Sequence, residues 1–91
     1  MEFDSYSFHS NKGEVVIARN EEHPSRWDLC IDGKLIRPEF YRCPDEAALR
    51  AHQRDFGDEE LNGIYVGLRV PSELSRWKPV NAFQKGALLH D

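Results

Sequence analysis

The Asp32-Gly33 dipeptide stands between two short runs of residues that alternate apolar with polar side chains. Both of its positions tolerate a positive φ, so the pattern predicts a two-residue turn and a β-hairpin over residues 26–37. This turn sets the register of the hairpin, with Ile31 opposite Lys34. The apolar side chains that the register gathers on one face, which we assign to the core, are Trp27, Leu29, Ile31 and Ile36.

One helix is predicted over residues 44–56. Pro44 suits the first helical position, where its missing N–H would have no partner in any case. Asp45 and Glu46 follow, and the dipole of a helix favours negative charge in its first turn. Gly57 is a natural stop after the last turn. The residues expected to share the buried face are Ala48, Leu49, His52 and Phe56.

Further strands are expected on both sides of the hairpin and helix. Residues 14–19 contain a β-branched run, and residues 64–70 alternate regularly, with Ile64, Val66, Leu68 and Val70 on one face. Residues 1–13 suggest a short strand and a turn, and residues 71–77 a short helical turn. These elements predict an α+β fold: a three- to four-stranded, mostly antiparallel sheet with one main helix on one face.

The 91 residues fit a single domain, 1–91. Residues 1–10 and 80–91 are expected to be loosely ordered. Ala87-Leu88-Leu89 near the end suggests a tail that docks either on the core of this chain or on a partner.

The net charge of −4 argues against a sequence-independent nucleic-acid binder, which normally carries a basic footprint. The charge is uneven, because residues 39–61 carry seven acidic and three basic side chains, whereas residues 62–91 carry two acidic and four basic ones. The sequence is that of a small, acidic, soluble protein with no stretch of 18 apolar residues, so no contact with a membrane is expected. Two cysteines without a CxxC pair, and an N-terminus unlike a signal peptide, predict a cytoplasmic protein with free thiols.

Catalytic and metal-binding patterns are absent from the sequence. The four histidines form no HxxxH pair, and no glycine-rich phosphate loop occurs. The acidic pairs fall at turns and at a helix start, where carboxylates are common. We therefore expect no metal, no cofactor and no catalytic residue. A small enzyme, the third-ranked alternative, would use His52 as acid or base, or Cys43 just before the helix, or Cys30.

A mixture of basic and aromatic residues marks the last third of the chain. The five residues singled out as a speculative protein-binding site are Tyr65, Arg69, Arg76, Trp77 and Lys78. Trp and Arg are enriched at the centres of protein interfaces, and they also stack on bases and pair with phosphates. The simpler interpretation has Trp77 packed on the core with its neighbours in solvent.

Three functions remain open on the sequence. The first is a non-enzymatic protein that acts through contact with another protein, as an inhibitor, an immunity-type partner or an accessory subunit. The second is a nucleic-acid accessory domain that presents Arg37, Tyr65 and Arg69 on an exposed sheet face. The third is the small enzyme described above. A homodimer formed through an unpaired edge strand is compatible with the first.

Overall fold

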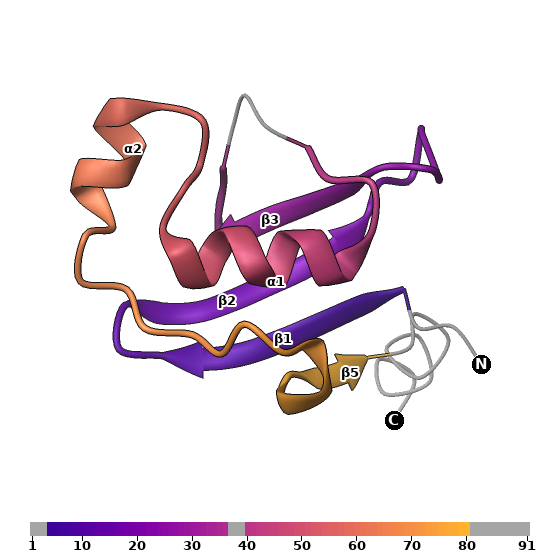
Figure 1. The fold of residues 1–91 in the computed structure, drawn as a ribbon. Coiled ribbons are helices and arrows are strands. Elements are labelled where there is room, and N and C mark those ends of the chain that lie inside the picture. The colour runs from indigo at the N-terminus through magenta and orange to yellow at the C-terminus, as the bar shows by residue number, and fades with distance from the viewer. Residues whose placement is uncertain (1–3, 37–39, 81–91) are drawn as a thin grey trace.

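The computed structural model describes residues 4–36 and 40–80, which fold as an antiparallel sheet with helices on one face (Figure 1). The sheet has the strand order β4-β3-β2-β1-β5. Its strands are β1 (Ser5–Ser10), β2 (Gly13–Arg19), β3 (Trp27–Ile31), β4 (Lys34–Leu35) and β5 (Lys78–Val80). The helices are α1 (Pro44–Gln53), α2 (Glu59–Ile64) and the 3-10 turn η1 (Leu74–Arg76). The α+β class is confirmed, but the sheet has five strands rather than three to four.

The predicted hairpin is confirmed as the pair β3 and β4. Asp32 and Gly33 form the turn with φ of 52° and 82°, and Ile31 faces Lys34 as expected. The four side chains assigned to the core, Trp27, Leu29, Ile31 and Ile36, are all buried. The local requirement for positive φ at two successive positions therefore determines the register of this part of the sheet.

Helix α1 begins at Pro44 as predicted, but it buries a different set of side chains. Ala47, Ala48 and Ala51 are fully buried, whereas Leu49 is 44% exposed and His52 is exposed. At 3.6 residues per turn, positions 47, 48 and 51 share one arc, His52 lies at its margin and Leu49 lies on the far side. The predicted buried face was therefore wrong for Leu49 and His52. The three small side chains allow α1 to lie close against β2 and β3 (Figure 1).

The end of α1 and the segment after it also differ from the prediction. The helix ends at Gln53, because Arg54 adopts the left-handed conformation with φ of 57° and caps it. Phe56 lies beyond the helix and is nonetheless fully buried.

The strand predicted over residues 64–70 does not form. Residues 59–64 form α2, and the chain then runs in an irregular path to η1. Leu68 and Val70 are buried as the alternation suggested, but Ile64 and Val66 are exposed. The strand that completes the sheet is β5, which lies in a part of the sequence without visible periodicity and pairs with β1.

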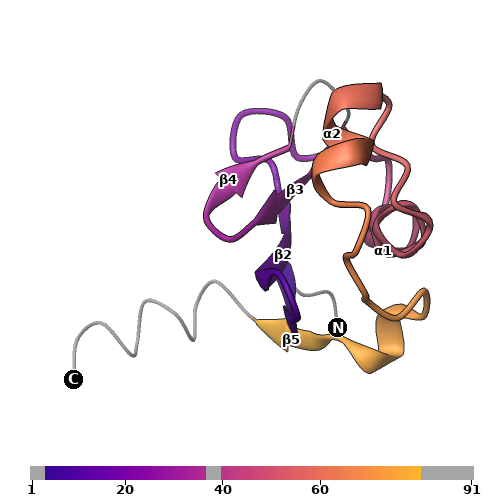
Figure 2. The same ribbon diagram turned by 90° about the vertical axis from the view of Figure 1, so that its left-hand side faces the viewer.

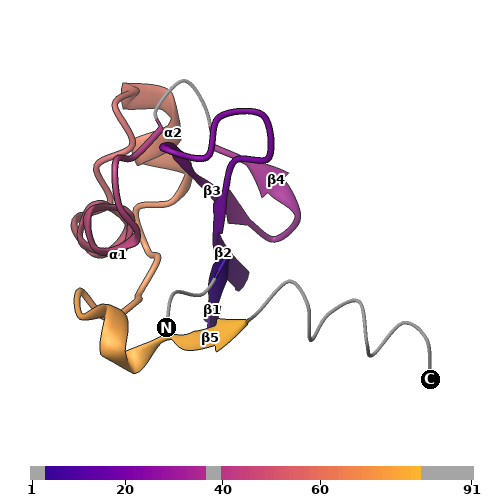
Figure 3. The same ribbon diagram turned by 90° about the vertical axis from the view of Figure 1, so that its right-hand side faces the viewer.

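Both helices lie on the same side of the sheet (Figures 2 and 3). The opposite face has no helix within residues 4–36 and 40–80, and we call it the open face. Cross-strand pairing puts Ser7, Val16, Cys30 and Leu35 of the open face in one row. Tyr65 and Arg69 are not part of the sheet, and Arg37 and Ala87-Leu88-Leu89 lie outside the described residues.

Candidate protein-binding surface

Helix α2 is fixed at its start by a side-chain cap. The Asp58 carboxylate accepts hydrogen bonds from the backbone N–H groups of Glu60, at 2.8 Å, and Leu61, at 3.2 Å. Such a cap satisfies backbone donors that have no partner within the helix, and it typically contributes about 1 kcal/mol. A helix of only six residues therefore has a defined first turn.

The inner side of α2 is attached to the core through Phe56. The Asn62 side-chain oxygen accepts the backbone N–H of Phe56 at 2.7 Å. The ring of Tyr65 meets the ring of Phe56 edge to face, with centroids 5.7 Å apart. Because Phe56 is fully buried, these two contacts fix the orientation of α2 relative to the rest of the domain.

The segment that leaves α2 is held by side chains from the connection between β1 and β2 and from the end of α1. Asn11 donates to the carbonyl of Gly67 at 2.7 Å and accepts the N–H of Arg69 at 3.0 Å. Arg54 donates to the carbonyl of Leu68 at 3.1 Å. His52 Nδ1 lies 2.8 Å from the carbonyl oxygen of Val70, which can only accept, so this nitrogen donates. His52 therefore positions the chain after α2.

The outward side of α2 is exposed. Leu61, Asn62 and Tyr65 are half-buried, whereas the residues that point away from the domain are in solvent. We call the exposed set, together with the residue after Tyr65, the α2 outer surface: Glu59, Glu60, Gly63, Ile64 and Val66. Ile64 is 56% exposed and Val66 is 71% exposed, both more than any other exposed large apolar side chain in the described residues.

The five residues predicted as a binding site do not form one cluster. Tyr65 packs on Phe56, and the exposed Arg69 follows α2. Arg76 ends η1, Lys78 begins β5 and Trp77 lies between them, and both elements are at the other end of the molecule from α2 (Figure 1). Arg76 and Lys78 are exposed. Their role in binding stays a prediction.

Trp77 occupies the core, as the simpler interpretation of the sequence had it. It is 2% exposed, its indole N–H donates to the carbonyl of Pro71 at 2.9 Å, and its ring lies 5.7 Å from that of Phe8. The exposure of Ile64 and Val66 was not predicted, because their alternation with polar residues suggested a buried strand face. The signal that could have revealed them is Asp58 followed by two glutamates, which is typical of a helix start.

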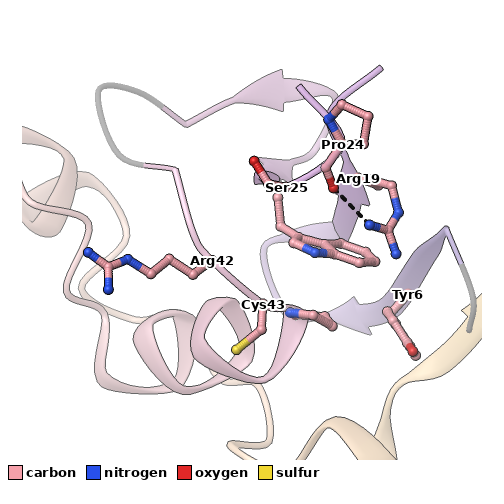
Figure 4. Close-up of a pocket in the computed structure, with 8 residues that line it drawn as sticks. Tyr6, Arg19, Pro24, Ser25, Arg42 and Cys43 are labelled. Atoms are coloured by element: carbon pink, nitrogen blue, oxygen red, sulfur yellow. Dashed lines mark hydrogen bonds between the residues drawn. The ribbon is translucent and has the colours of Figure 1, made fainter. Parts of the chain in front are cut away.

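A shallow cavity of about 210 Å³ lies where the loop after β2 meets the start of α1 (Figure 4). Arg19 is one of its lining residues, and its guanidinium lies 4.6 Å from the centre of the Trp27 ring and donates to the carbonyl of Pro24 at 2.7 Å. Arg42 extends away from Arg19 (Figure 4). The volume is below the range of about 300–1,000 Å³ typical of small-molecule sites, so we interpret the cavity as a consequence of packing.

The two cysteines are free and lie in different surroundings. Cys30 is half-buried on the open face, where burial and, secondly, the Asp28 carboxylate raise the pKa of its thiol. Cys43 is exposed just before α1. Across the described parts of the chain, no group of three or more His, Cys, Asp or Glu side chains could hold a metal ion.

Iodoacetamide at pH 8 is therefore expected to modify Cys43 several-fold faster than Cys30. Alkylation requires the thiolate, which a raised pKa and burial both disfavour at Cys30. Mass spectrometry of tryptic peptides over time measures the two rates. Faster modification of Cys30 than of Cys43 would contradict this placement of the two thiols.

The raised pKa of Cys30 also affects the stability of the fold. Any stability gained from the neutral Cys30 thiol is present at pH 8 and declines as the pH rises through the folded pKa of the thiol.

Comparison of the chain with protein-family models, with curated proteins and with solved structures found no match. None of the helices in residues 4–36 and 40–80 is long and apolar enough to cross a membrane.

Proposed function

We propose that this protein acts by binding another protein, without catalysing a reaction, and that the α2 outer surface makes the contact. An inhibitor, an immunity-type partner and an accessory subunit all act in this way. The observation that carries the proposal is the exposure of Ile64, the last residue of α2, and of Val66, two residues further along the chain, in a segment that is attached to the core. Clustered exposed apolar side chains mark interaction sites on soluble proteins.

The anchoring of α2 favours binding energetically. Burial of apolar surface contributes about 25 cal/mol for each Å² removed from water. The cap at Asp58 and the contacts of Asn62 and Tyr65 with Phe56 order this segment before a partner arrives. Less conformational entropy is then lost on association, so more of the burial energy remains as affinity.

The charge of the described surfaces supports a protein partner over a nucleic acid. The α2 outer surface carries two carboxylates and no basic side chain. The open face has a row formed by Lys78, Ser7, Val16, Cys30 and Leu35, with one basic side chain and without an aromatic ring on which a base could stack. Of the residues on which the nucleic-acid alternative depended, Tyr65 and Arg69 are not part of the sheet, and Arg37 lies outside the described residues.

Affinity capture from a lysate of the host tests the proposal with three baits. These are the tagged wild-type chain, the double variant Ile64→Asp/Val66→Asp, and the control Leu35→Asp. Leu35 is 40% exposed on β4, and its pairing with Cys30 puts it on the open face, whereas α2 lies on the other side of the sheet (Figure 2). We expect one stoichiometric protein on the wild-type and control baits after nuclease treatment, and at least tenfold less of it on the double variant.

Equal melting temperatures of the three baits, within a few degrees, would establish that each is folded. Capture that is the same on the wild-type and double-variant baits would overturn the assignment of the surface. Capture that disappears on nuclease treatment would overturn the proposal that the partner is a protein and would favour the nucleic-acid alternative.

A further inference from the structure

Gly63 lies in the middle of the α2 outer surface, although the fold of this chain does not require a glycine there. Its φ is not in the left-handed region, unlike Gly13, Gly33 and Gly57. A Cβ atom built on Gly63 meets no atom within 4 Å. Glycine in a helix lowers stability by up to about 1 kcal/mol relative to alanine. Gly63 therefore reduces the stability of α2 and leaves the backbone at this position uncovered by a side chain. An open backbone allows another chain to approach closely.

Two carboxylates border this open position. Glu59 and Glu60 are exposed, and neither makes an ion pair with another of the described residues. The other two acidic side chains of residues 55–68 are engaged, since Asp55 pairs with Arg50 at 2.8 Å and Asp58 caps α2. No basic residue occurs in residues 55–68. The unpaired negative charge of this segment is therefore concentrated on the outer side of α2.

We infer that the partner of the α2 outer surface is a basic, apolar protein segment whose backbone crosses α2 at Gly63. This inference rests on the proposed function, because it names the chemistry of the partner at the same surface. Lysine or arginine side chains of the segment face Glu59 and Glu60. Its apolar side chains cover Ile64 and Val66.

The α2 outer surface of a second copy of this chain does not suit the same surface. Two α2 outer surfaces face to face would bring together the four carboxylates of their Glu59 and Glu60 residues. Like charges in such an arrangement disfavour association, whereas a basic segment is attracted to Glu59 and Glu60 and an acidic competitor is repelled by them.

Selection from a random peptide library displayed on phage, with the full chain immobilised at low salt, tests the inference. The enriched peptides are expected to combine Lys or Arg with large apolar residues. Their affinity, measured by fluorescence anisotropy, should fall at least tenfold with Glu59→Lys/Glu60→Lys. The control Glu21→Lys/Glu22→Lys changes the net charge equally at two exposed loop residues and should leave the affinity within about twofold.

Variants at Gly63 test the close approach separately. Gly63→Ala should raise the melting temperature by up to about 4 °C, because it improves helix propensity in open space. Gly63→Gln should also fold, but its longer side chain should weaken the selected peptides at least tenfold. Affinity unchanged by Gly63→Gln would overturn the crossing at Gly63.

The outcomes separate this inference from the proposed function. Peptides that lose affinity for Ile64→Asp/Val66→Asp, but are acidic or are unaffected by Glu59→Lys/Glu60→Lys, would overturn the inference and leave the proposed function in place. Enrichment only of peptides that bind Ile64→Asp/Val66→Asp as tightly as the wild type would contradict both.

Discussion

Replacing Phe56 with alanine is expected to lower the free energy of unfolding by about 3–5 kcal/mol. Phe56 is fully buried and packs against the ring of Tyr65, so its loss leaves a cavity between α1 and α2. Total stabilities of single domains are about 5–15 kcal/mol, and this one change would therefore remove a large share. Urea denaturation followed by circular dichroism measures the effect.

Leu49→Ala is the matched control for Phe56→Ala. Leu49 lies on α1 and is 44% exposed, so its truncation should cost less than about 1 kcal/mol. Equal losses from the two variants would contradict the assignment of Phe56 to the core and of Leu49 to the surface.

Trp77→Ala is the second change with a large expected effect, again about 3–5 kcal/mol of unfolding free energy. The variant loses the burial of the ring, its contact with Phe8 and the hydrogen bond from the indole N–H to the carbonyl of Pro71. Thermal and urea denaturation of the same samples would report the loss.

The exposed residues on either side provide the comparison for Trp77→Ala. Arg76→Ala and Lys78→Ala should each change stability by no more than about 0.5 kcal/mol, because both side chains are exposed. A Trp77→Ala variant as stable as these two would contradict the placement of Trp77 in the core. It would also restore Trp77 as an exposed candidate for binding.

The parts of the fold that were predicted correctly depend on local chemistry. Asp32 and Gly33 determine a turn through their own backbone preferences, and the turn then determines which residues of β3 and β4 are paired. The start of α1 is equally local, since Pro44 and the acidic residues after it suit a first helical turn. Signals within a few residues were sufficient in both places.

The parts that were missed depend on contacts distant in the sequence. β5 is defined by its pairing with β1, more than 70 residues earlier, and its own residues show no periodicity. The regular alternation of residues 64–70 was a genuine signal for the burial of Leu68 and Val70. It failed at Ile64 because the cap at Asp58 starts a helix that includes that residue.

The candidate surface was predictable only in part. Tyr65 was identified, but its ring proved to be an anchor of α2 on Phe56. Ile64 and Val66 could not be recognised as exposed from the sequence, because an apolar residue in an alternating run is normally buried. Ile64 and Val66 are exposed because contacts with the rest of the domain fix which side of this segment faces solvent. These contacts include the hydrogen bonds of Asn11, which is distant in the sequence.

Site-specific photo-crosslinking in the host is a direct test of binding through the α2 outer surface. A benzophenone amino acid is placed at position 66, on the α2 outer surface, or at position 35, on the open face. We expect one discrete covalent adduct with another protein from position 66, none from position 35, and loss of the adduct when Ile64→Asp is added. An adduct from position 35 alone, or none from position 66 in folded protein, would contradict binding through α2.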